Sequence, residues 1–360
     1  MTVAVDKFIV FNKPDLGEEE MSAVMDVIRS GWIGTGNVAH QFEEEFADFM
    51  GGGYAVAVSS CTVGLQLALK ALKMGPNSKV VTSPLTFAAT VNAILNSGAY
   101  PVFVDVDSRG CMDMKQANLK TDFLTKAIIP VHFSGTPCDI SKLSGEVKII
   151  EDCAHAFGTL FGESGDMKVF SFYPNKNITC GEGGMVVCKD KAMADAIRVL
   201  SSQGLSQGAW ARFGSGPVKK YEVEQVGLKG NLPDVLAAIG LAQLRRWPEL
   251  RQKRLKVWRV YEKAFGRIHY GHSTHFYPIK VNYRDQVRQK LYNKGIGTGI
   301  HYKPLHLEPA YKFLGYEKGD FPMAEMWGAQ ELSLPVSATM TESDALRVVH
   351  EVQKIIGEKK

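Results

Sequence analysis

Short apolar runs alternate with helical stripes of apolar residues along the first part of the chain. Two helical stripes come first, at 21–30 and 42–50. After them come strand-like runs at 54–59, 80–82, 101–105, 127–131 and 147–151, and helical segments at 62–72 and 87–95. The strand-like runs are apolar throughout rather than alternating, which indicates burial on both faces. Strands that alternate with helices predict a mostly parallel sheet in a layered α/β domain.

The second part of the chain has a different pattern. A helical stretch extends from Pro233 to about Phe265, and we expect a break in it at Trp247–Pro248. Beyond it, the pattern predicts a strand at 275–281 and helices at 287–294 and 341–356. These elements suggest a small α+β unit. We therefore expect a large domain at 1–248 and a small C-terminal domain at 249–360.

Composition excludes several classes of protein. The chain has 360 residues, 45% hydrophobic and 22% charged, with a net charge of +4, as in an ordinary globular protein. This small charge, without a basic run that contains aromatics, does not suggest nucleic-acid binding. No apolar run approaches the roughly 20 residues that span a bilayer. The six cysteines form no CxxC pair, and the N-terminus does not resemble a signal peptide. We expect reduced thiols and a cytoplasmic location.

Lys176 is the main candidate for a catalytic residue. It follows the strand-like run Phe170–Tyr173, which stops at Pro174. Upstream, another apolar run ends on Asp152. A lysine in a tight loop beside a strand-end carboxylate is what a pyridoxal phosphate (PLP) site requires. The amine forms a Schiff base with the aldehyde, and the carboxylate keeps the pyridine nitrogen protonated. A single loop lysine is otherwise a solvated charge.

Two features could bind the phosphate of such a cofactor. The segment Ser59–Gly64 lies between a predicted strand and a predicted helix, where free N–H groups and the helix dipole attract an anion. It could equally be a plain helix cap made by Ser60 or Thr62. The hydroxyl of Ser171, five residues before Lys176, is a second candidate for the phosphate.

Three further side chains follow predicted strands. Phe87 could stack on a flat cofactor or simply pack in the core. His155 could bond the phenolic oxygen of the cofactor or be a core histidine. Asp152 could serve the cofactor or cap the next turn. Each alternative is reasonable alone, but all of these groups fall at strand ends together with Lys176, which favours a common cofactor site.

With these residues in this order, the chain resembles the DegT/DnrJ/EryC1/StrS family of sugar aminotransferases, a fold-type-I PLP group. The matching stretches are 30–36, 101–107, 128–132, 151–156, 170–184, 234–244 and 301–306. They cover essentially the whole chain. The resemblance implies a large domain with a mostly parallel, seven-stranded sheet between helices, and a small C-terminal α+β domain. It also implies a homodimer whose active site is shared between subunits.

The resemblance implies a role for each matching residue. Lys176 holds PLP covalently and moves the proton, Asp152 pairs with the pyridine nitrogen, His155 lies beside the ring oxygen, and Phe87 stacks on the ring. The phosphate is held by Cys61, Thr62 and Ser171, and by Asn231, favoured over Lys229, from the neighbouring subunit. The residues expected to contact substrate are Trp32, Gly34, Thr35, His301, Tyr302 and His306.

The sequence departs from the family pattern at two places. Asn175 precedes the lysine where the family usually has threonine, and the segment around Leu228 and Gly230 lacks the usual aromatics. Neither departure removes a catalytic group, so both are expected to alter the substrate side of the site.

The implied reaction is a two-step transamination. Glutamate gives its amino group to PLP, leaving the pyridoxamine 5'-phosphate form, which then aminates a 3- or 4-keto group of a nucleotide-linked sugar. The Lys229-x-Asn231 variant favours a UDP-linked 4-keto sugar. The product would be an amino sugar for a polysaccharide, a glycoconjugate or a glycosylated metabolite.

Three other functions fit these residues less well. A related PLP-dependent sugar dehydratase would carry histidine in place of Lys176. A non-catalytic, PLP-binding regulatory protein would have lost a catalytic group, and none is missing. An NAD-dependent oxidoreductase is suggested by Gly34–Ala39, which fits G-x-G-x-x-A but follows a helix rather than a strand. The spaced histidines His269, His272 and His275 lack nearby cysteine or carboxylate ligands, so no metal is predicted.

Overall fold

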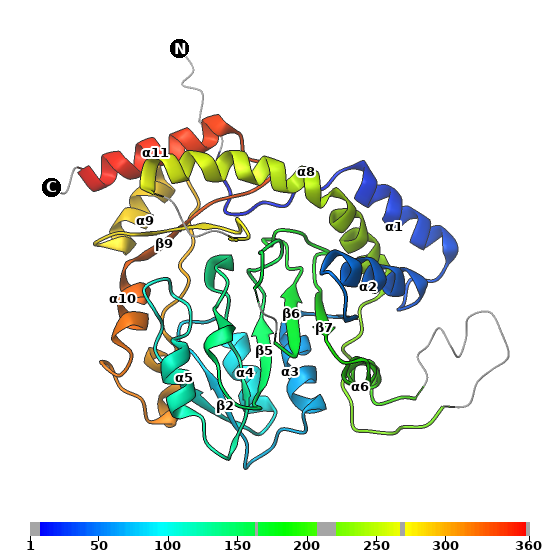
Figure 1. The fold of residues 1–360 in the computed structure, drawn as a ribbon. Helices are drawn as coiled ribbons and strands as arrows, with labels where there is room; N and C mark the ends of the chain where they lie inside the picture. Colours follow the sequence, from blue (N-terminus) through cyan, green and yellow to red (C-terminus); the bar gives the residue numbers. More distant parts are fainter. Residues whose placement is uncertain (1–7, 163–164, 207–220, 267–270, 358–360) are drawn as a thin grey trace.

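The computed structural model describes residues 8–162, 165–206, 221–266 and 271–357 (Figure 1). His269 and most of the N-terminal segment that does not resemble a signal peptide lie outside these ranges. Within the described part of the chain, no helix combines the length and the apolar character needed to cross a bilayer.

A seven-stranded sheet in the order β1-β7-β6-β5-β4-β2-β3 forms the centre of the described molecule. Its pairs are parallel from β3 through β6, and β7 is antiparallel to both β6 and β1. The prediction of a mostly parallel sheet is therefore confirmed. The strands are β1 (Tyr54–Val58), β2 (Lys79–Thr82), β3 (Tyr100–Phe103), β4 (Thr125–Ile128), β5 (Lys148–Asp152), β6 (Met167–Ser171) and β7 (Gly184–Cys188).

Helices cover both faces of this sheet. Successive side chains of a strand point to opposite faces, and in β1 both sets are apolar. Val56 and Val58 pack with residues of α3 and α6, whereas Ala55 and Ala57 pack with residues of α2 and α8. The helices of this part of the molecule are α2 (Asn37–Phe49), α3 (Cys61–Ala71), α4 (Ala88–Asn96), α5 (Met114–Lys120), α6 (Lys191–Ser201) and α8 (Asp234–Phe265).

Helix α8 is the longest element, and it does not break where the sequence suggested. It continues through Pro248 for 32 residues, so the expected break at Trp247–Pro248 is wrong. Trp247 and Leu250, on either side of the proline, are both buried against the sheet core. Their packing holds the helix together although Pro248 cannot donate its backbone hydrogen bond.

Most of the C-terminal elements share a core with the second half of α8, whereas α10 (Pro322–Gln330) packs with α4 and β3. Strands β8 (Tyr277–Lys280) and β9 (Glu331–Leu334) form an antiparallel pair. The helices are α9 (Arg284–Asn293), α10 (Pro322–Gln330) and α11 (Glu342–Gly357), with short 3-10 turns η1 (Phe133–Gly135), η2 (Ile140–Lys142), η3 (Leu305–Leu307) and η4 (Pro309–Leu314) elsewhere. Figure 1 shows α11 beside α8. Along α8, Leu244 packs with the sheet and Val257 with β8 and β9. The division at 248/249 stays a prediction.

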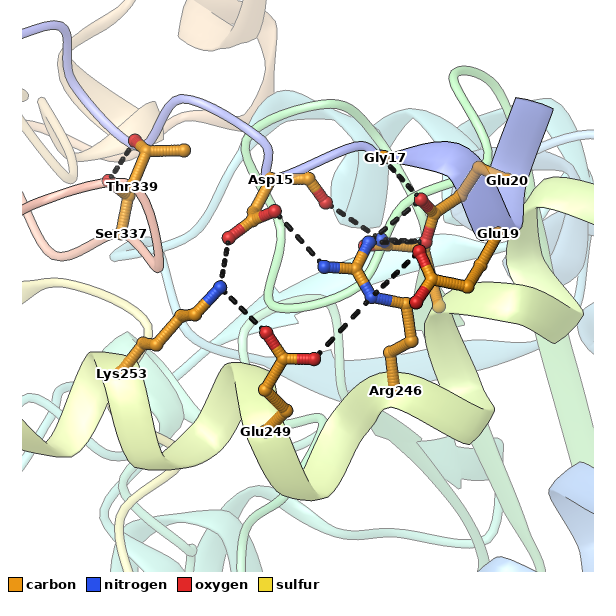
Figure 2. A network of polar contacts seen from close by, with 10 residues as sticks. Asp15, Gly17, Glu19, Glu20, Arg246, Glu249, Lys253, Ser337 and Thr339 are labelled. Atoms are coloured by element: carbon orange, nitrogen blue, oxygen red, sulfur yellow. Dashed lines mark hydrogen bonds and ion pairs between the residues drawn. The ribbon is translucent and has the colours of Figure 1, made fainter.

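Helix α1 (Glu18–Ser30) is fastened to α8 by charged side chains rather than by its apolar stripe. Arg246 on α8 lies 2.7 Å from the carboxylate of Glu20 and 3.1 Å from that of Asp15. Lys253 bridges Asp15 and Glu249, as Figure 2 shows. Glu20 is only 3% exposed. A buried carboxylate needs such a partner, so the network holds α1 in place.

Candidate active site

The ends of three strands meet at one edge of the sheet. Ser171, at the end of β6, and Val58, at the end of β1, both lie opposite Gly184, the first residue of β7. Strand β5, beside β6, ends at Asp152. The carboxyl ends of neighbouring strands are where α/β sheets bind ligands. The sheet thus places Asp152, Ser171 and the loop after β1 side by side.

Asp152 is almost completely buried at this edge. One carboxylate oxygen accepts a hydrogen bond from the hydroxyl of Thr90 at 2.7 Å, and the other accepts one from the N–H of Ala154 at 3.1 Å. The second contact is the capping interaction that the sequence left open. Burial raises the pKa of Asp152, and the Thr90 hydroxyl, the Ala154 N–H and the charge of Lys176 oppose that rise. The carboxylate is held in one orientation by groups that favour its charged form.

Lys176 lies in the loop between β6 and β7, where its N–H bonds the carbonyl of Tyr173 at 2.9 Å. Burial lowers the pKa of its ammonium group from 10.5 to about 8, against the opposing charges of Cys61 and Asp152. A lysine with this pKa is a far better nucleophile near neutral pH than a solvated one. The two predicted catalytic groups therefore interact through their charges.

His155 joins this site to the C-terminal part of the chain. Its Nε2 atom lies 2.9 Å from the hydroxyl of Tyr302. The rings of His301 and Tyr302 lie 5.6 and 5.9 Å from its own ring, centroid to centroid. Burial lowers the pKa of His155 well below its ordinary value, and the charge of Lys176 adds to this effect. His155 is therefore neutral, and the structure brings together three residues that were predicted from two separate stretches, 151–156 and 301–306.

The start of α3 offers a place for an anion. Ser60 caps the helix, since its hydroxyl accepts the N–H of Val63 at 3.2 Å. The capping role and an anion site are compatible, because a cap leaves other N–H groups of the first turn, here those of Cys61 and Thr62, without helical partners. Gly184 lets the backbone of β7 pass close to the first turn of α3, since a Cβ at Gly184 would stand 2.7 Å from the Cys61 nitrogen.

The segment that contains the predicted substrate residues Trp32, Gly34 and Thr35 lies against the segment that carries Asn231. The Asn231 amide donates to the hydroxyl of Thr35 at 2.5 Å, and that hydroxyl donates to the carbonyl of Leu232 at 2.6 Å. Asp234, at the start of α8, accepts the N–H of Gly36 at 2.7 Å. Asn231 also forms an isolated bridge with Val58 at the end of β1. The role of Asn231 in a neighbouring subunit stays a prediction, as do the substrate roles of Trp32, Gly34 and Thr35.

Of two further predicted residues, Phe87 lies beside Tyr302, and within the described residues His306 makes no hydrogen bond or ring contact with the group around His155. Phe87 is 61% exposed and lies beside Tyr302, with ring centroids 6.0 Å apart. His306 is buried in η3, where its Nε2 lies 3.1 Å from Glu325 and its ring packs on Phe321. These contacts with a different part of the molecule do not join His306 to His155, so its substrate role stays a prediction.

Sequence reasoning missed several residues that support the site. Thr90 orients Asp152, and Glu331 and Ser333 both bond His301. Polar residues at alternate positions in the apolar strand around Leu332 were an available signal for the last two. His275 packs 4.8 Å from His155, and neither of its buried ring nitrogens has a partner within the described residues.

One cluster has the composition of a metal site but not its bonding. Ligand atoms of His132, Glu151 and Cys153 lie within 4.8 Å of one another. However, His132 Nδ1 accepts the N–H of Cys138 at 3.0 Å, and its Nε2 lies 2.8 Å from Glu151. Glu151 also faces Lys168 at 3.4 Å. Both imidazole nitrogens are thus used and the carboxylate charge is balanced, so we assign no metal to this cluster.

Comparison with known proteins gives matches along nearly the whole chain. The sequence model of the DegT/DnrJ/EryC1/StrS aminotransferase family matches residues 14–353. The spore coat polysaccharide biosynthesis protein SpsC of Bacillus subtilis is 38% identical over an alignment of 378 positions, which covers 97% of each chain.

Solved structures share the fold as well. Spr1654 of Streptococcus pneumoniae, known in PLP and PMP forms, superposes with a TM-score of 0.90 at 29% identity; the PMP form covers 97% of this chain and 99% of its own. PseC of Helicobacter pylori, an aminotransferase involved in the biosynthesis of pseudoaminic acid, has a TM-score of 0.87 at 26% identity and covers 98% of this chain and 100% of its own.

Proposed function

The chain belongs to the DegT/DnrJ/EryC1/StrS aminotransferase family and is a PLP-dependent transaminase, and on this premise we propose that it moves the amino group of L-glutamate to a keto group of a nucleotide-linked sugar. The observation that carries the proposal is the half-buried Lys176, whose pKa is lowered to about 8 and whose charge interacts with the oriented carboxylate of Asp152. We propose a UDP-linked 4-keto sugar as the first acceptor to test, on the basis of the Lys229-x-Asn231 segment.

The residues of this chain fit PLP. When bound, the cofactor supplies an aldehyde carbon and an electron-accepting ring. Asp152 provides a buried carboxylate for the ring nitrogen, and its two hydrogen bonds from Thr90 and Ala154 keep it from rotating. The N–H groups at the start of α3 and the Ser171 hydroxyl provide donors for the phosphate. Phe87 provides an exposed aromatic face beside Tyr302.

Lys176 is suited to moving a proton in both directions. A general base works best when its pKa lies near the operating pH, because it then exists in both protonation states. Burial brings the pKa of Lys176 into that range. We propose that in the first half-reaction the free amine takes the proton from the donor carbon of glutamate and gives it up again, and that in the second it takes up a proton and delivers it to the acceptor carbon.

We also propose that the enzyme works as a homodimer in the cytoplasm. All six cysteines are free and buried, which supports a reducing compartment. Apolar side chains face outward on α1, where Met21, Met25 and Ile28 are about half exposed. Val223 and Val226, close to Asn231 in sequence, are exposed as well. Such surfaces are typical of protein contacts. The mass of one chain is 39.6 kDa. A holoenzyme that sediments at twice this mass would support the dimer, and one that sediments at the mass of a single chain would contradict it.

A substrate panel tests the proposed reaction directly. UDP-, dTDP- and GDP-linked 3-keto and 4-keto sugars are incubated with the holoenzyme and nitrogen-15-labelled glutamate, and the products are weighed by mass spectrometry. We expect the label in one amino sugar. Conversion of glutamate without labelled sugar would contradict the acceptor class. Loss of water from the sugar without glutamate would favour the dehydratase instead.

A further inference from the structure

Two polar side chains of strand β9 hold the backbone and the ring of His301. One carboxylate oxygen of Glu331 accepts the N–H of His301 at 2.7 Å. The other carboxylate oxygen lies 2.5 Å from the hydroxyl of Ser333, which in turn lies 2.7 Å from Nδ1 of His301. Glu331 and Ser333 are completely buried. A continuous chain of hydrogen bonds therefore runs from the Glu331 carboxyl group to the imidazole.

The ring of His301 is clamped so that one nitrogen is left for a ligand. Its ring stacks on Phe276 at 4.2 Å and lies 5.8 Å from Phe11 on a similar plane. Its edge meets His155 and Tyr302 at 5.6 and 4.8 Å. Within the described residues, no protein group bonds Nε2 of His301. Burial and the charge of Lys176 lower the pKa of His301 to about 3, so the ring stays neutral and carries one proton.

The position of that proton depends on the direction of the hydrogen-bond chain. If Glu331 is ionised, it accepts the Ser333 proton, and Ser333 accepts a proton from Nδ1; Nε2 then has a free lone pair. If Glu331 is protonated, it donates to Ser333, and Ser333 donates to Nδ1; the imidazole proton then lies on Nε2. The backbone N–H of His301 bonds Glu331 in both states.

We propose that Glu331 and Ser333 are positioning residues that select which ring nitrogen of His301 carries its proton, and so whether His301 accepts or donates a hydrogen bond at the active site. The inference rests on the proposed function only in that it takes His301 to face the substrate. It makes the acceptor specificity of the site depend on the carboxyl group of Glu331, which contacts His301 through its backbone N–H and through Ser333.

The electrostatics around Glu331 place the switch near the working range of an enzyme. Burial raises the pKa of Glu331 from 4.5 to about 8, against the N–H of His301, the Ser333 hydroxyl and the charge of Arg284. Arg284 on α9 bonds the Glu331 carbonyl at 2.8 Å rather than its carboxylate. Lys280, opposite Glu331 on β8, has its amine over the Trp327 ring. Below about pH 8 Glu331 is protonated and Nε2 carries the proton; above it, Nδ1 does.

Nitrogen NMR of the full-length holoenzyme with ring-labelled histidine tests this directly. The His301 signals are assigned by their loss in His301→Gln. In the wild type we expect the Nε2–H form at low pH to give way to the Nδ1–H form as pH passes about 8. Glu331→Gln should stay in the Nε2–H form throughout, because its amide oxygen accepts from the His301 N–H and its amide nitrogen can only donate to Ser333.

Ser333 provides the control for a merely structural effect. Ser333→Ala keeps the bond between Glu331 and the His301 backbone but removes the link to Nδ1, so the His301 signals should no longer follow pH, whereas Ser333→Thr should restore the response. Two results would overturn the inference. One is a His301 tautomer in the wild type that does not change with pH, and the other is a tautomer that is the same in the wild type and in Glu331→Gln at high pH. The NMR measurements on the wild type and on the variants need no sugar substrate, so a failure of the substrate panel would leave their result unaffected.

Discussion

The hydroxyl of Tyr302 lies 2.9 Å from Nε2 of His155, although 147 positions separate the two residues in the chain. Burial raises the pKa of Tyr302 well above its ordinary value and lowers that of His155, so both groups are neutral. Two neutral groups therefore share this hydrogen bond, and either the phenol or Nε2 can be its donor. This contact joins the loop after β5 to the C-terminal part of the molecule, and it links the tautomer of His155 to the orientation of the Tyr302 hydroxyl.

Tyr302→Phe should slow the half-reaction with glutamate roughly tenfold, because it leaves a buried histidine nitrogen without its hydrogen-bond partner, at a cost of about 1–3 kcal/mol. The decay of the visible absorbance of the holoenzyme after mixing with glutamate measures the rate. Tyr292→Phe, on the exposed face of α9, is the matched control and should react as the wild type. An unchanged rate in Tyr302→Phe would show that the contact has no part in the reaction.

Lys176→Ala should lose covalent attachment of PLP and at least about a thousandfold in turnover, since both the amine that binds the aldehyde and the group that moves the proton are removed. Borohydride reduction followed by peptide mapping identifies the labelled lysine. Lys126→Ala, which removes an exposed lysine of β4, should label and react normally. Label on a lysine other than Lys176 would refute the catalytic assignment.

The loading of cofactor-free enzyme with PLP should depend on pH in a way that reflects the environment of Lys176. Only the neutral amine attacks the aldehyde, and the pKa of Lys176 is lowered to about 8. The rate should therefore rise about tenfold per pH unit below 8 and level off above it. Stopped-flow absorbance measures it.

Asp152→Asn provides an internal check on this profile. The charge of Asp152 favours the ammonium form of Lys176, so its removal should move the midpoint to lower pH, while the half-reaction with glutamate slows sharply. A loading rate that keeps rising to the pKa of an ordinary lysine would contradict the burial of Lys176.

Arg246→Ala should reduce the free energy of unfolding by about 3 kcal/mol, because it leaves the buried carboxylate of Glu20 without its cation. The adjacent Arg245→Ala removes an exposed pair with Glu45 and should cost less than about 1 kcal/mol. Urea unfolding of both variants measures the difference. Equal losses would mean that the network in Figure 2 does not stabilise α1 on α8.

Local patterns were enough to identify the sheet and the residues at its edge. Strands that are apolar at every position must be buried on both faces, and the residues that come directly after such strands necessarily meet at the carboxyl edge. This is why Asp152, Ser171 and Lys176 could be chosen from the sequence. The interruption expected at Pro248 was wrong because the packing of Trp247 and Leu250 outweighs one missing hydrogen bond.

Helix α1 shows the limit of the same reasoning. The spacing of Met21, Met25 and Ile28 correctly predicts a helix, but this apolar stripe faces outward, and Glu20 and Val27 are buried instead. Periodicity determines that one face of a helix is apolar. The partner of each face depends on charges elsewhere in the chain, here on Arg246 and Lys253 of α8.

The sequence alone determined the fold class and the family, and it predicted the chemistry of Lys176 and Asp152, because these depend on short segments whose character is visible in a few neighbouring residues. Only the tertiary structure decided that Thr90 orients Asp152, that Tyr302 bonds His155 and that Glu331 lies behind His301. Such contacts join residues far apart in the chain. Their existence depends on how whole elements pack, and no local pattern of hydrophobic and polar positions specifies that.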